Sequence, residues 1–521
     1  METTIYVTSI KIKKTLIYLT LQSKQNLDPR DIKLVCKNEM NPASVPLVFS
    51  ASHTGRTVIQ TCIDTEALHL QNDDWEITVS SGSEEHTPVL DNRIRTALIL
   101  FSYKIKSGQN FLFFPMGGPG HKFLLRCRPL TKYDGAGTQI RELTAFLLSK
   151  LLKPFWKKKK VWLIYEKYSS SAQDNGFYFF RYCMEHLPPQ RRRHIYFILD
   201  KSSPQWPAMQ KYRKQILPFM SFRHILYLLL ADLYVASDAR LHAFAWKPMP
   251  NLISREINRH DIFFLQHGVL GLKRVETLFG KNGASPMTYF AVSSEKEQRI
   301  VTEYFGYDSS HVPVVGLARW DALENKSDPC RKKILVMPTW RSWLEDKDDD
   351  FFCKSDYYQT YMHLFQNEAL LDLLKTSNTC MVFYIHPKLK EFMKSFHSES
   401  PLIQLIPFGQ CPLNHLIMEC SMLITDYSSV CWDVYYLEKP VVFYQFDSEL
   451  YEKTNGSYMD MEHDLFGDRC ILEDQLINTI KDYIQSDFHE KEKYKKMRKD
   501  LFAFRDHNNC RRIYDFIIKN R

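Results

Sequence analysis

The sequence predicts an α/β protein with two doubly wound domains that face a cleft, preceded by a small β-rich domain. Short runs that alternate apolar and polar residues fill the first 133 residues, strand and helix patterns alternate from Val161, and that alternation restarts at Lys333. Strands that alternate with helices predict a parallel sheet covered on both faces. Two such sheets in succession predict a cleft, with a ligand at the carboxyl ends of the strands.

Residues 1–133 are predicted to form a β-rich accessory domain. The segments TLIYLTLQ, WEITVSS and NFLFFP have the alternation of half-buried strands, and the stretches NPAS, QNDD and MGGPGH carry turn residues. Several short strands separated by turns favour a small sandwich.

Residues 134–160 are predicted to form an amphipathic linker helix with a basic end. Its apolar residues fall near helical spacing: Ile140, Leu143, Phe146, Leu147, Leu151 and Phe155. The run WKKKK closes the segment, and lysines near an anionic membrane surface contribute about 1 kcal/mol each. The alternative is a helix packed on the next domain, with a solvated lysine run.

Residues 161–328 and 329–521 are predicted to be the two doubly wound domains. The apolar strands of the first are VWLIY, HIYFILD, ADLYVASDA, DIFFLQHG, YFAVSS and VPVVGL. Those of the second are KILVMPTW, TCMVFYIHP, IQLIPF, SMLITDYSS and PVVFYQFD. The spacers between them have helical patterns.

Composition limits the classes of partner and compartment. The net charge of +9 favours anionic partners, but the basic runs lack the interleaved aromatic residues of nucleic-acid stacking platforms, so no nucleic acid is expected. Twelve cysteines without a CxxC pair or metal-ligand spacing predict reduced thiols of a cytosolic protein and no metal site. No secretory leader is visible, and no apolar run reaches the roughly 20 residues that span a bilayer, so any membrane contact is expected to be peripheral.

Four polar clusters follow directly after predicted strands, where an α/β sheet binds its ligand. The clusters are Gln266-His267-Gly268, Pro338-Thr339-Trp340-Arg341, His386-Pro387 and Thr425-Asp426-Tyr427-Ser428-Ser429. In the last cluster a predicted strand ends and a predicted helix begins. A helix start capped by serine attracts phosphate through its amides and dipole, although plain capping by Ser428 or Asp426 without a ligand is equally open.

His267 and Arg341 have side chains suited to phosphate chemistry. A histidine with an ordinary pKa near 6.5 can remove a proton from a hydroxyl, and Gly268 next to it permits close approach of another molecule. Arg341 can bind phosphate through two donors, and His386 can donate to phosphate. The alternatives are a structural strand-end histidine and a surface arginine stacked on a tryptophan. The sequence lacks GxxxxGK[ST], HExxH, GxSxG and a GxGxxG after a strand.

Taken in order, the motifs QHGV, GLARWDAL, PTWR, IHP and LITDYSSVCWDVYYLEKPVVFYQFD resemble those of the CDP-glycerol glycerophosphotransferase family. This family contains the teichoic-acid primases and polymerases of bacterial cell-wall and capsule synthesis. The resemblance covers about residues 160–510 and leaves out residues 1–133. Gln266 stands where many members have tryptophan, which leaves the polyol and the acceptor open.

The resemblance implies a GT-B architecture, in which a Rossmann-like acceptor domain faces a Rossmann-like CDP-donor-binding domain, and it implies no required metal or cofactor. It also implies transfer of glycerol phosphate or ribitol phosphate from CDP-glycerol or CDP-ribitol, with release of CMP. The acceptor would be a lipid-linked polyprenyl-diphosphate saccharide or polymer. The protein would then be peripheral on the cytoplasmic face of the cell membrane.

Carried over by position, His267 is similar to the general base of that family, and Asp426 to a residue that orders the phosphate loop. The positions similar to donor or phosphate contacts are Gly268, Arg319, Thr339, Arg341, His386, Thr425, Ser428 and Ser429. Two alternatives remain: a GT-B glycosyltransferase that uses a nucleotide-sugar, and a non-catalytic scaffold on the membrane surface.

Overall fold

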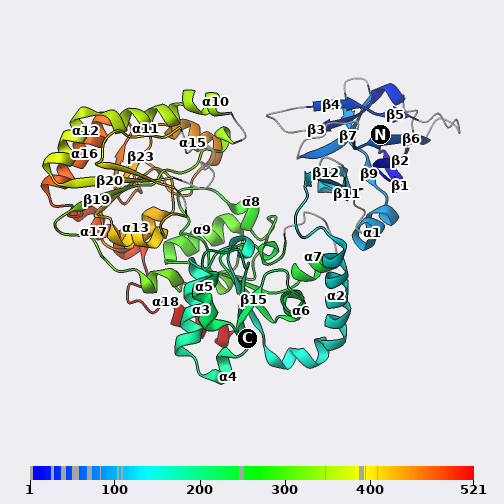
Figure 1. Ribbon diagram of the computed structural model, residues 1–521, viewed down its shortest axis with the longest axis horizontal. Helices are drawn as coiled ribbons and strands as arrows, with labels where there is room; N and C mark the ends of the chain where they lie inside the picture. Colours follow the sequence, from blue (N-terminus) through cyan, green and yellow to red (C-terminus); the bar gives the residue numbers. More distant parts are fainter. Residues whose placement is uncertain are drawn as a thin grey trace. The chain divides into compact units, whose positions relative to one another are not determined.

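The computed structural model describes residues 4–24, 28–36, 43–49, 58–66, 73–81, 84–101, 105–106, 110–245, 252–345, 348–385, 392, 395–407 and 409–521. The chain forms two compact units (Figure 1). The first contains residues 1–157, 220–230 and 244–260, and the second contains residues 158–219, 231–243 and 261–521.

The first unit begins with two mainly antiparallel sheets around one core. The first sheet has the order β5-β6-β2-β1-β9, and the second has the order β10-β11-β12-β7-β3-β4, with β8 paired to β7. Their bounds are β1 Tyr6–Lys13, β2 Leu16–Gln22, β3 Ile32–Cys36, β4 Ala43–Pro46, β5 Val48–Phe49, β6 Val58–Asp64, β7 Asp74–Ser81, β8 Glu84–His86, β9 Val89–Leu90, β10 Ile105–Lys106, β11 Phe111–Gly117 and β12 Phe123–Pro129. Leu19 of one sheet and Trp75 and Phe113 of the other belong to one buried cluster, which explains why the two sheets pack face to face.

Helix α2 (Ala136–Trp156) turns its small residues inward and its large apolar residues outward. Its buried positions are Thr138, Ala145 and Ser149. It packs on α6 (Phe222–Leu230), and Lys150 pairs with Glu256 of α7 (Leu252–Ile257) at 2.9 Å. α1 spans Asn92–Phe101. Because α6 and α7 pack with α2, their segments join the first unit, whereas the sequence boundaries place them in the first doubly wound domain.

The second unit contains two parallel six-stranded sheets with the same order. The first lobe has the order β15-β14-β13-β16-β17-β18, and the second lobe has β21-β20-β19-β22-β23-β24. The bounds are β13 Trp162–Tyr165, β14 Ile195–Leu199, β15 Ile216–Pro218, β16 Leu233–Ala236, β17 Ile262–Phe264, β18 Tyr289–Phe290, β19 Lys332–Val336, β20 Thr379–Tyr384, β21 Ile403–Ile406, β22 Met422–Thr425, β23 Val441–Tyr444 and β24 Asp468–Cys470. Both are the 3-2-1-4-5-6 order of doubly wound folds, which confirms the predicted fold class.

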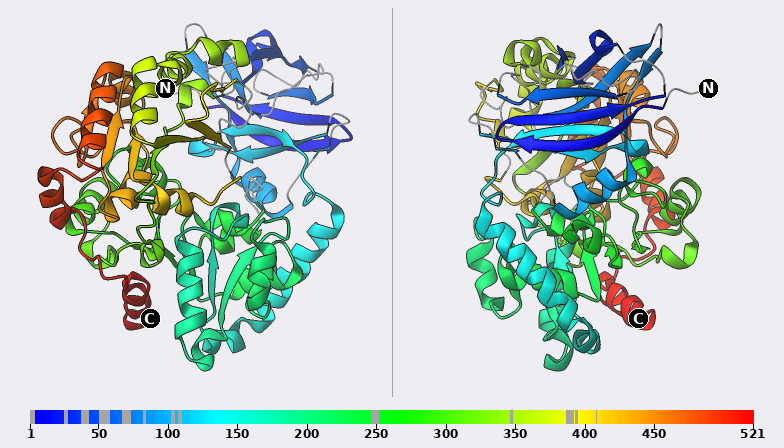
Figure 2. Two further views of the ribbon diagram at one scale, coloured as in Figure 1. Left: turned by 60° about the vertical axis from the view of Figure 1, so that its left-hand side comes forward. Right: turned by 90° about the vertical axis from the view of Figure 1, so that its right-hand side faces the viewer.

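Most residues of these strands are buried, so both faces of each sheet must be covered. Helices provide this cover. In the left view of Figure 2, helices flank the yellow-to-orange strands of the second lobe. The first lobe contains α3 Asn175–His186, α4 Pro189–Arg192, α5 Trp206–Met209, α8 Glu276–Phe279 and α9 Glu295–Phe305. The second contains α10 Asp349–Lys354, α11 Asp356–Gln366, α12 Glu368–Thr376, α13 Leu413–Glu419, α14 Val430–Tyr436, α15 Ser448–Asn455, α16 Glu473–Gln485 and α17 Glu492–Leu501.

The chain crosses between the lobes twice. It leaves the first lobe through the 3₁₀ turn η8 (Ala318–Ala322) and returns to it with α18 (Asn509–Lys519). Ile513 and Ile517 of α18 join the buried cluster of the first lobe, so the last helix in the sequence completes the first sheet domain. Within the described residues, no helix is both long and apolar enough to span a bilayer.

Candidate active site

The polar clusters that the sequence predicts lie at the carboxyl ends of the parallel strands. In the first lobe Asp174 lies in the loop after β13, Asp238 follows β16, and His267 follows β17. In the second lobe Thr339 follows β19, and the segment 426–429 follows β22. β13 and β16, like β19 and β22, flank the point where the strand order reverses, which is where such sheets bind ligands.

His267 lies between two carboxylates. Its Nδ1 is 2.9 Å from Asp174 Oδ2, and its Nε2 is 2.8 Å from Asp238 Oδ2. Desolvation lowers the pKa of the ring, but the hydrogen bonds and negative charges of Asp174 and Asp238 outweigh it and raise the pKa to about 10. Burial raises the pKa of Asp238, but the contacts of this carboxylate with His242, at 3.1 Å, and with His267 hold its pKa below the ordinary value. At neutral pH the ring is therefore an imidazolium, and 42% of its side chain is open to an incoming molecule.

The loop that carries His267 is held by Glu297. The buried Glu297 accepts hydrogen bonds from Leu270 N at 2.7 Å and from Ser293 N at 2.6 Å, and Gln266 Nε2 donates to it at 3.2 Å. Gln266 has a φ of 62°, a left-handed conformation that costs free energy in a residue with a side chain. The network around Glu297 stabilises this turn and thereby the direction in which His267 projects.

Asp174 is placed by a second buried carboxylate. Glu166, the residue after β13, accepts hydrogen bonds from Gln173 N at 3.1 Å, Asp174 N at 2.8 Å and Phe177 N at 2.9 Å. Burial and the nearby charge of Asp174 raise the pKa of Glu166 to about 7. Glu166 therefore fixes the loop that brings Asp174 to the histidine.

Arg319 connects the two lobes. Its Nε and Nη2 each donate to Asp433 of α14 at 2.8 Å, and its Nη1 donates to Asp174 at 3.1 Å and also to the His267 carbonyl. The side chain is buried, and its donors lie on protein groups. In this arrangement Arg319 positions Asp174 and α14. The sequence predicts that Arg319 contacts phosphate directly, and such a contact would require Arg319 to release Asp174 or Asp433.

Gly268 touches Ser429 of the opposite lobe. A Cβ atom added at Gly268 would lie 2.5 Å from Ser429 Oγ and 2.7 Å from Ser429 Cβ, far inside van der Waals contact. Only a glycine fits here without movement, so the histidine loop and the serine loop are in direct contact.

The two serines before α14 differ in exposure. Ser428 Oγ accepts a hydrogen bond from Val430 N at 3.4 Å, which is the capping contact considered from the sequence. Ser429 is exposed and makes no side-chain cap bond. Thr425 Oγ1 donates to the Met337 carbonyl at 2.7 Å, so its hydroxyl joins neighbouring strands.

Arg341 and Asp426 form a buried pair behind this loop. Asp426 accepts from Thr339 N at 2.8 Å and lies 2.7 Å from Arg341 Nη1, and Arg341 Nε donates to Asp447 at 2.6 Å. Arg341 is fully buried, which favours a structural role over the direct phosphate contact that the sequence suggests. Asp426 also accepts a hydrogen bond from Tyr427 N at 2.6 Å. Thr339 Oγ1 is buried without a hydrogen-bond partner among the described residues. His386 lies outside the described residues.

The sequence interpretation missed Asp174, Asp238, Asp433 and Glu166. Three of these follow the rule that found His267. Glu166 and Asp174 come after the strand VWLIY, and Asp238 comes after the strand in ADLYVASDA. Asp433 has no such signal, because it lies inside a helix and is recognised only through its contact with Arg319.

Two doubly wound lobes that meet through polar loops at their strand ends are typical of the GT-B class of fold. Residues 145–519 match the sequence profile of the family described as CDP-glycerol:poly(glycerophosphate) glycerophosphotransferase. The chain belongs to this family, as the resemblance of its motifs predicted.

Individual relatives agree with this assignment. The chain is 27% identical over 380 residues to the minor teichoic acid biosynthesis protein GgaB of Bacillus subtilis (strain 168), a match covering 70% of this chain and 40% of GgaB. It is 28% identical over 236 residues to the teichoic acid glycerol-phosphate primase of the same strain, covering 43% of this chain and 56% of the primase. The solved structure of the wall teichoic acid polymerase TagF is similar in fold, with a TM-score of 0.52, 16% identity, and coverage of 75% of this chain and 98% of that one.

Proposed function

We propose that the chain transfers glycerol phosphate or ribitol phosphate from a CDP-polyol to an acceptor hydroxyl, with release of CMP, in teichoic acid or capsule polymer synthesis. Family membership supports this reaction class. The observation that carries the proposal is the approach of Gly268 to Ser429, because it brings an acid–base group of one lobe to a hydroxyl-rich loop of the other.

The reaction is an in-line displacement at phosphorus. The acceptor oxygen forms a bond to the phosphorus that bears the polyol, while the bond from that phosphorus to the oxygen bridging it to CMP breaks. CMP leaves with the electron pair, and the proton of the acceptor hydroxyl goes to His267. Catalysis of such transfers consists mainly of positioning and of stabilising charge.

His267 can accept that proton only after one of its two carboxylate contacts opens. When an acceptor hydroxyl takes the place of one carboxylate, the ring proton that faced that carboxylate passes through it to solvent. The ring is then neutral, with its unprotonated nitrogen bonded to the hydroxyl and the other nitrogen bonded to the remaining aspartate. That aspartate then stabilises the imidazolium as the proton arrives. Asp174 and Asp238 are therefore orienting residues for His267 in this proposal.

The donor diphosphate is proposed to lie against the second lobe. Ser429 and Ser428 offer hydroxyls at the start of α14, and Thr339 follows the neighbouring strand β19. Arg341 is proposed to act through Asp426, since it is buried behind the loop. His386 completes the proposed set of donor contacts.

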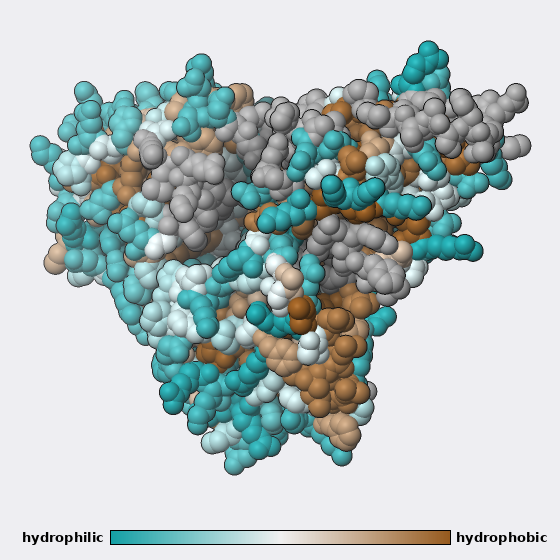
Figure 3. Space-filling view, turned by 45° about the vertical axis from the view of Figure 1, so that its right-hand side comes forward, coloured by the Kyte–Doolittle hydropathy of each residue, from teal (hydrophilic) through white to brown (hydrophobic). Residues whose placement is uncertain are grey.

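The acceptor is proposed to be lipid-linked, with the chain peripheral on the cytoplasmic face of the membrane. Five large apolar side chains of α2 are between 56% and 77% exposed: Ile140, Leu143, Leu147, Leu151 and Phe155. Figure 3 shows an apolar area on the face that presents α2. Lys150, Lys153 and the lysines of 157–160 lie beside it in sequence, which suits an anionic lipid surface.

The test is CMP release. Purified protein is incubated with a membrane extract and with CDP-glycerol, CDP-ribitol or a UDP-sugar, and the nucleotide products are quantified. CMP from a CDP-polyol supports the proposal, and UDP from a UDP-sugar supports the glycosyltransferase alternative. Absence of nucleotide release with every donor, for a folded protein and an active extract, refutes transfer and leaves the scaffold alternative.

A further inference from the structure

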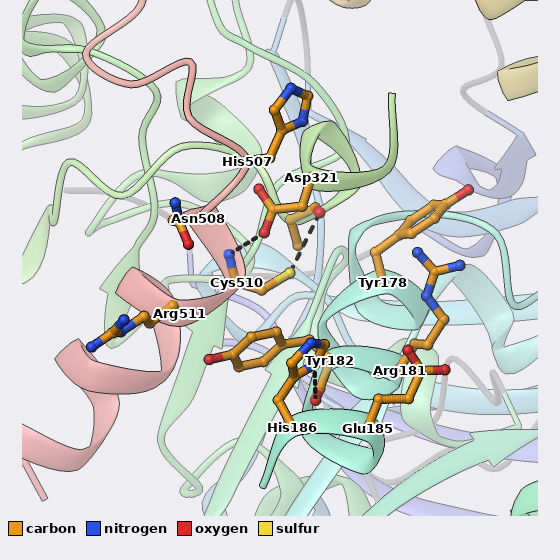
Figure 4. Close-up of a pocket in the computed structure, with 11 residues that line it drawn as sticks. Tyr178, Arg181, Tyr182, Glu185, His186, Asp321, His507, Asn508, Cys510 and Arg511 are labelled. Atoms are coloured by element: carbon orange, nitrogen blue, oxygen red, sulfur yellow. Dashed lines mark hydrogen bonds between the residues drawn. The ribbon is translucent and has the colours of Figure 1, made fainter. Parts of the chain in front are cut away.

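A cavity of about 360 Å³ lies where the chain crosses between the lobes (Figure 4). One wall is helix α3, and the others are η8 and the start of α18. We call this cavity the α3–α18 pocket. Its volume is at the small end for ligand pockets and suits a unit such as a polyol phosphate.

The side chains of the pocket combine rings with cations. Tyr178, Tyr182 and His186 recur along one face of α3, and the rings of Tyr182 and His186 stack at 4.7 Å. Arg181 of α3 and Arg511 of α18 lie on opposite sides of the pocket in Figure 4. Rings favour the carbon face of a hydroxylated chain, and guanidinium groups favour phosphate.

The acids of the pocket are already engaged by the protein. Asp321 accepts hydrogen bonds from Asn509 N at 2.9 Å and Cys510 N at 2.7 Å and so caps α18. Glu185 accepts from the Tyr212 hydroxyl at 2.9 Å. In contrast, Arg511 is 3.6 Å from Asp515 with both side chains exposed, a weak pair. These partners are neutral, so both acids keep their charge, but within the described residues neither acid is paired with an arginine of the pocket. Arg181 lies over the Tyr178 ring at 5.0 Å, and its guanidinium, like that of Arg511, can bind an anion.

Helix α3 links the pocket to His267. Asp174 precedes the first turn of α3 and contacts the histidine, and Tyr178 comes one turn later, where Asn414 of the second lobe donates to its hydroxyl. From Tyr178 to His186 the helix rises about 12 Å. The pocket thus extends along α3 away from His267 by about 12 Å, a length that a short segment of polyol phosphate can span.

We propose that the α3–α18 pocket binds a phosphodiester-linked polyol segment of the acceptor or product chain. The inference rests on the proposed function and extends it, because it assigns a second substrate subsite outside the catalytic crevice. One phosphate of the segment would contact Arg181, the next would contact Arg511, and the polyol between them would lie against Tyr182. Free phosphate alone would gain the cation contacts but not the ring contacts.

The test measures binding directly, without a donor. A synthetic trimer of glycerol phosphate is titrated into the wild-type chain and into the variant Arg181→Ala/Arg511→Ala by calorimetry, with inorganic phosphate as the comparison ligand. Loss of charge-assisted bonds is expected to weaken trimer binding by about tenfold or more. Arg213→Ala, which removes an exposed arginine of the same lobe outside the pocket, is expected to bind like wild type.

Each outcome decides one question. Equal trimer affinity of wild type and double variant, no trimer binding by wild type, or phosphate binding as tight as trimer binding overturns the subsite. Trimer binding that depends on the two arginines supports the subsite even if CMP release fails and the proposed function falls. Arg181→Lys, which keeps the charge, is expected to bind more tightly than Arg181→Ala, and equal affinities contradict the charge contact.

Discussion

Replacing Gly268 by alanine tests whether the contact between Gly268 and Ser429 is present during the reaction. The added Cβ would lie 2.5 Å from Ser429 Oγ and 2.7 Å from Ser429 Cβ, whereas carbon contacts settle at about 3.5–4.0 Å. The two loops must therefore separate by about 1 Å. The φ of Gly268 is not in the left-handed range, so the backbone itself accepts alanine and the effect is one of space.

A displacement of this size is expected to lower kcat/KM for CMP release about 100-fold, because a misplacement of about 1 Å between reacting groups costs that much. The assay uses the CDP-polyol that the wild-type chain turns over, with thermal melting to show that the variant is folded. Gly137→Ala is the matched control, since a Cβ there meets nothing within 4 Å. It is expected to leave turnover unchanged.

The double variant Gly268→Ala/Ser429→Gly distinguishes the steric clash at Gly268 from the loss of the Ser429 hydroxyl. Removal of the Ser429 side chain abolishes the clash but also removes a proposed phosphate contact. If the clash explains the defect, the double variant is no slower than Ser429→Gly alone, so the two effects are not additive. Wild-type turnover by folded Gly268→Ala would refute the reasoning, because the lobes would not then meet at this point during the reaction.

Three further predictions concern the same charges and surfaces. His267→Ala is expected to retain donor binding and to lose about 10²–10⁴-fold in rate, and turnover at the wild-type rate would rule out the base assignment. The pKa of His267 is raised from 6.5 to about 10, so its contribution to stability is complete below pH 6.5 and is lost as the pH rises through 10. Asp238→Asn should lower this pKa and flatten the fall of melting temperature across that window; an unchanged slope would contradict the ion pair. Leu147→Glu/Leu151→Glu is expected to weaken binding to vesicles that contain anionic lipid about tenfold, and Leu450→Glu, at an exposed leucine of α15, should not; equal binding would exclude α2 as the contact.

Much of the fold follows from local patterns. Buried strands read as continuous apolar runs, and a polar cluster after each run marks its carboxyl end, so His267 and Ser429 could be placed near one crevice from the sequence. The sequence also shows the large apolar residues of α2 at helical spacing. The sequence does not show that these residues are exposed, because it cannot say which face of an amphipathic helix packs against the core.

The role of a charged side chain is harder to predict because it depends on partners far away in the sequence. Arg341 follows a strand, as a phosphate ligand would, but Asp447 lies about a hundred residues further on and completes a buried pair with it. Arg319 is fixed by Asp433 in the same way. A buried arginine that loses its carboxylate partners leaves an uncompensated charge, which is strongly destabilising. In the folded protein these arginines therefore stabilise the structure and are not free to bind phosphate.

These pairs also explain how the site can act as a unit. Arg319 holds Asp174, which contacts His267, and it holds Asp433 in the helix that begins beside Ser429. One guanidinium thus joins the group proposed to accept the proton with the loop proposed to bind phosphate. Its planar fork makes both contacts at once, which a lysine with a single ammonium cannot reproduce. The relative placement of the proposed base and the proposed phosphate site therefore depends on Arg319, even though its donors lie on the protein and not on a substrate.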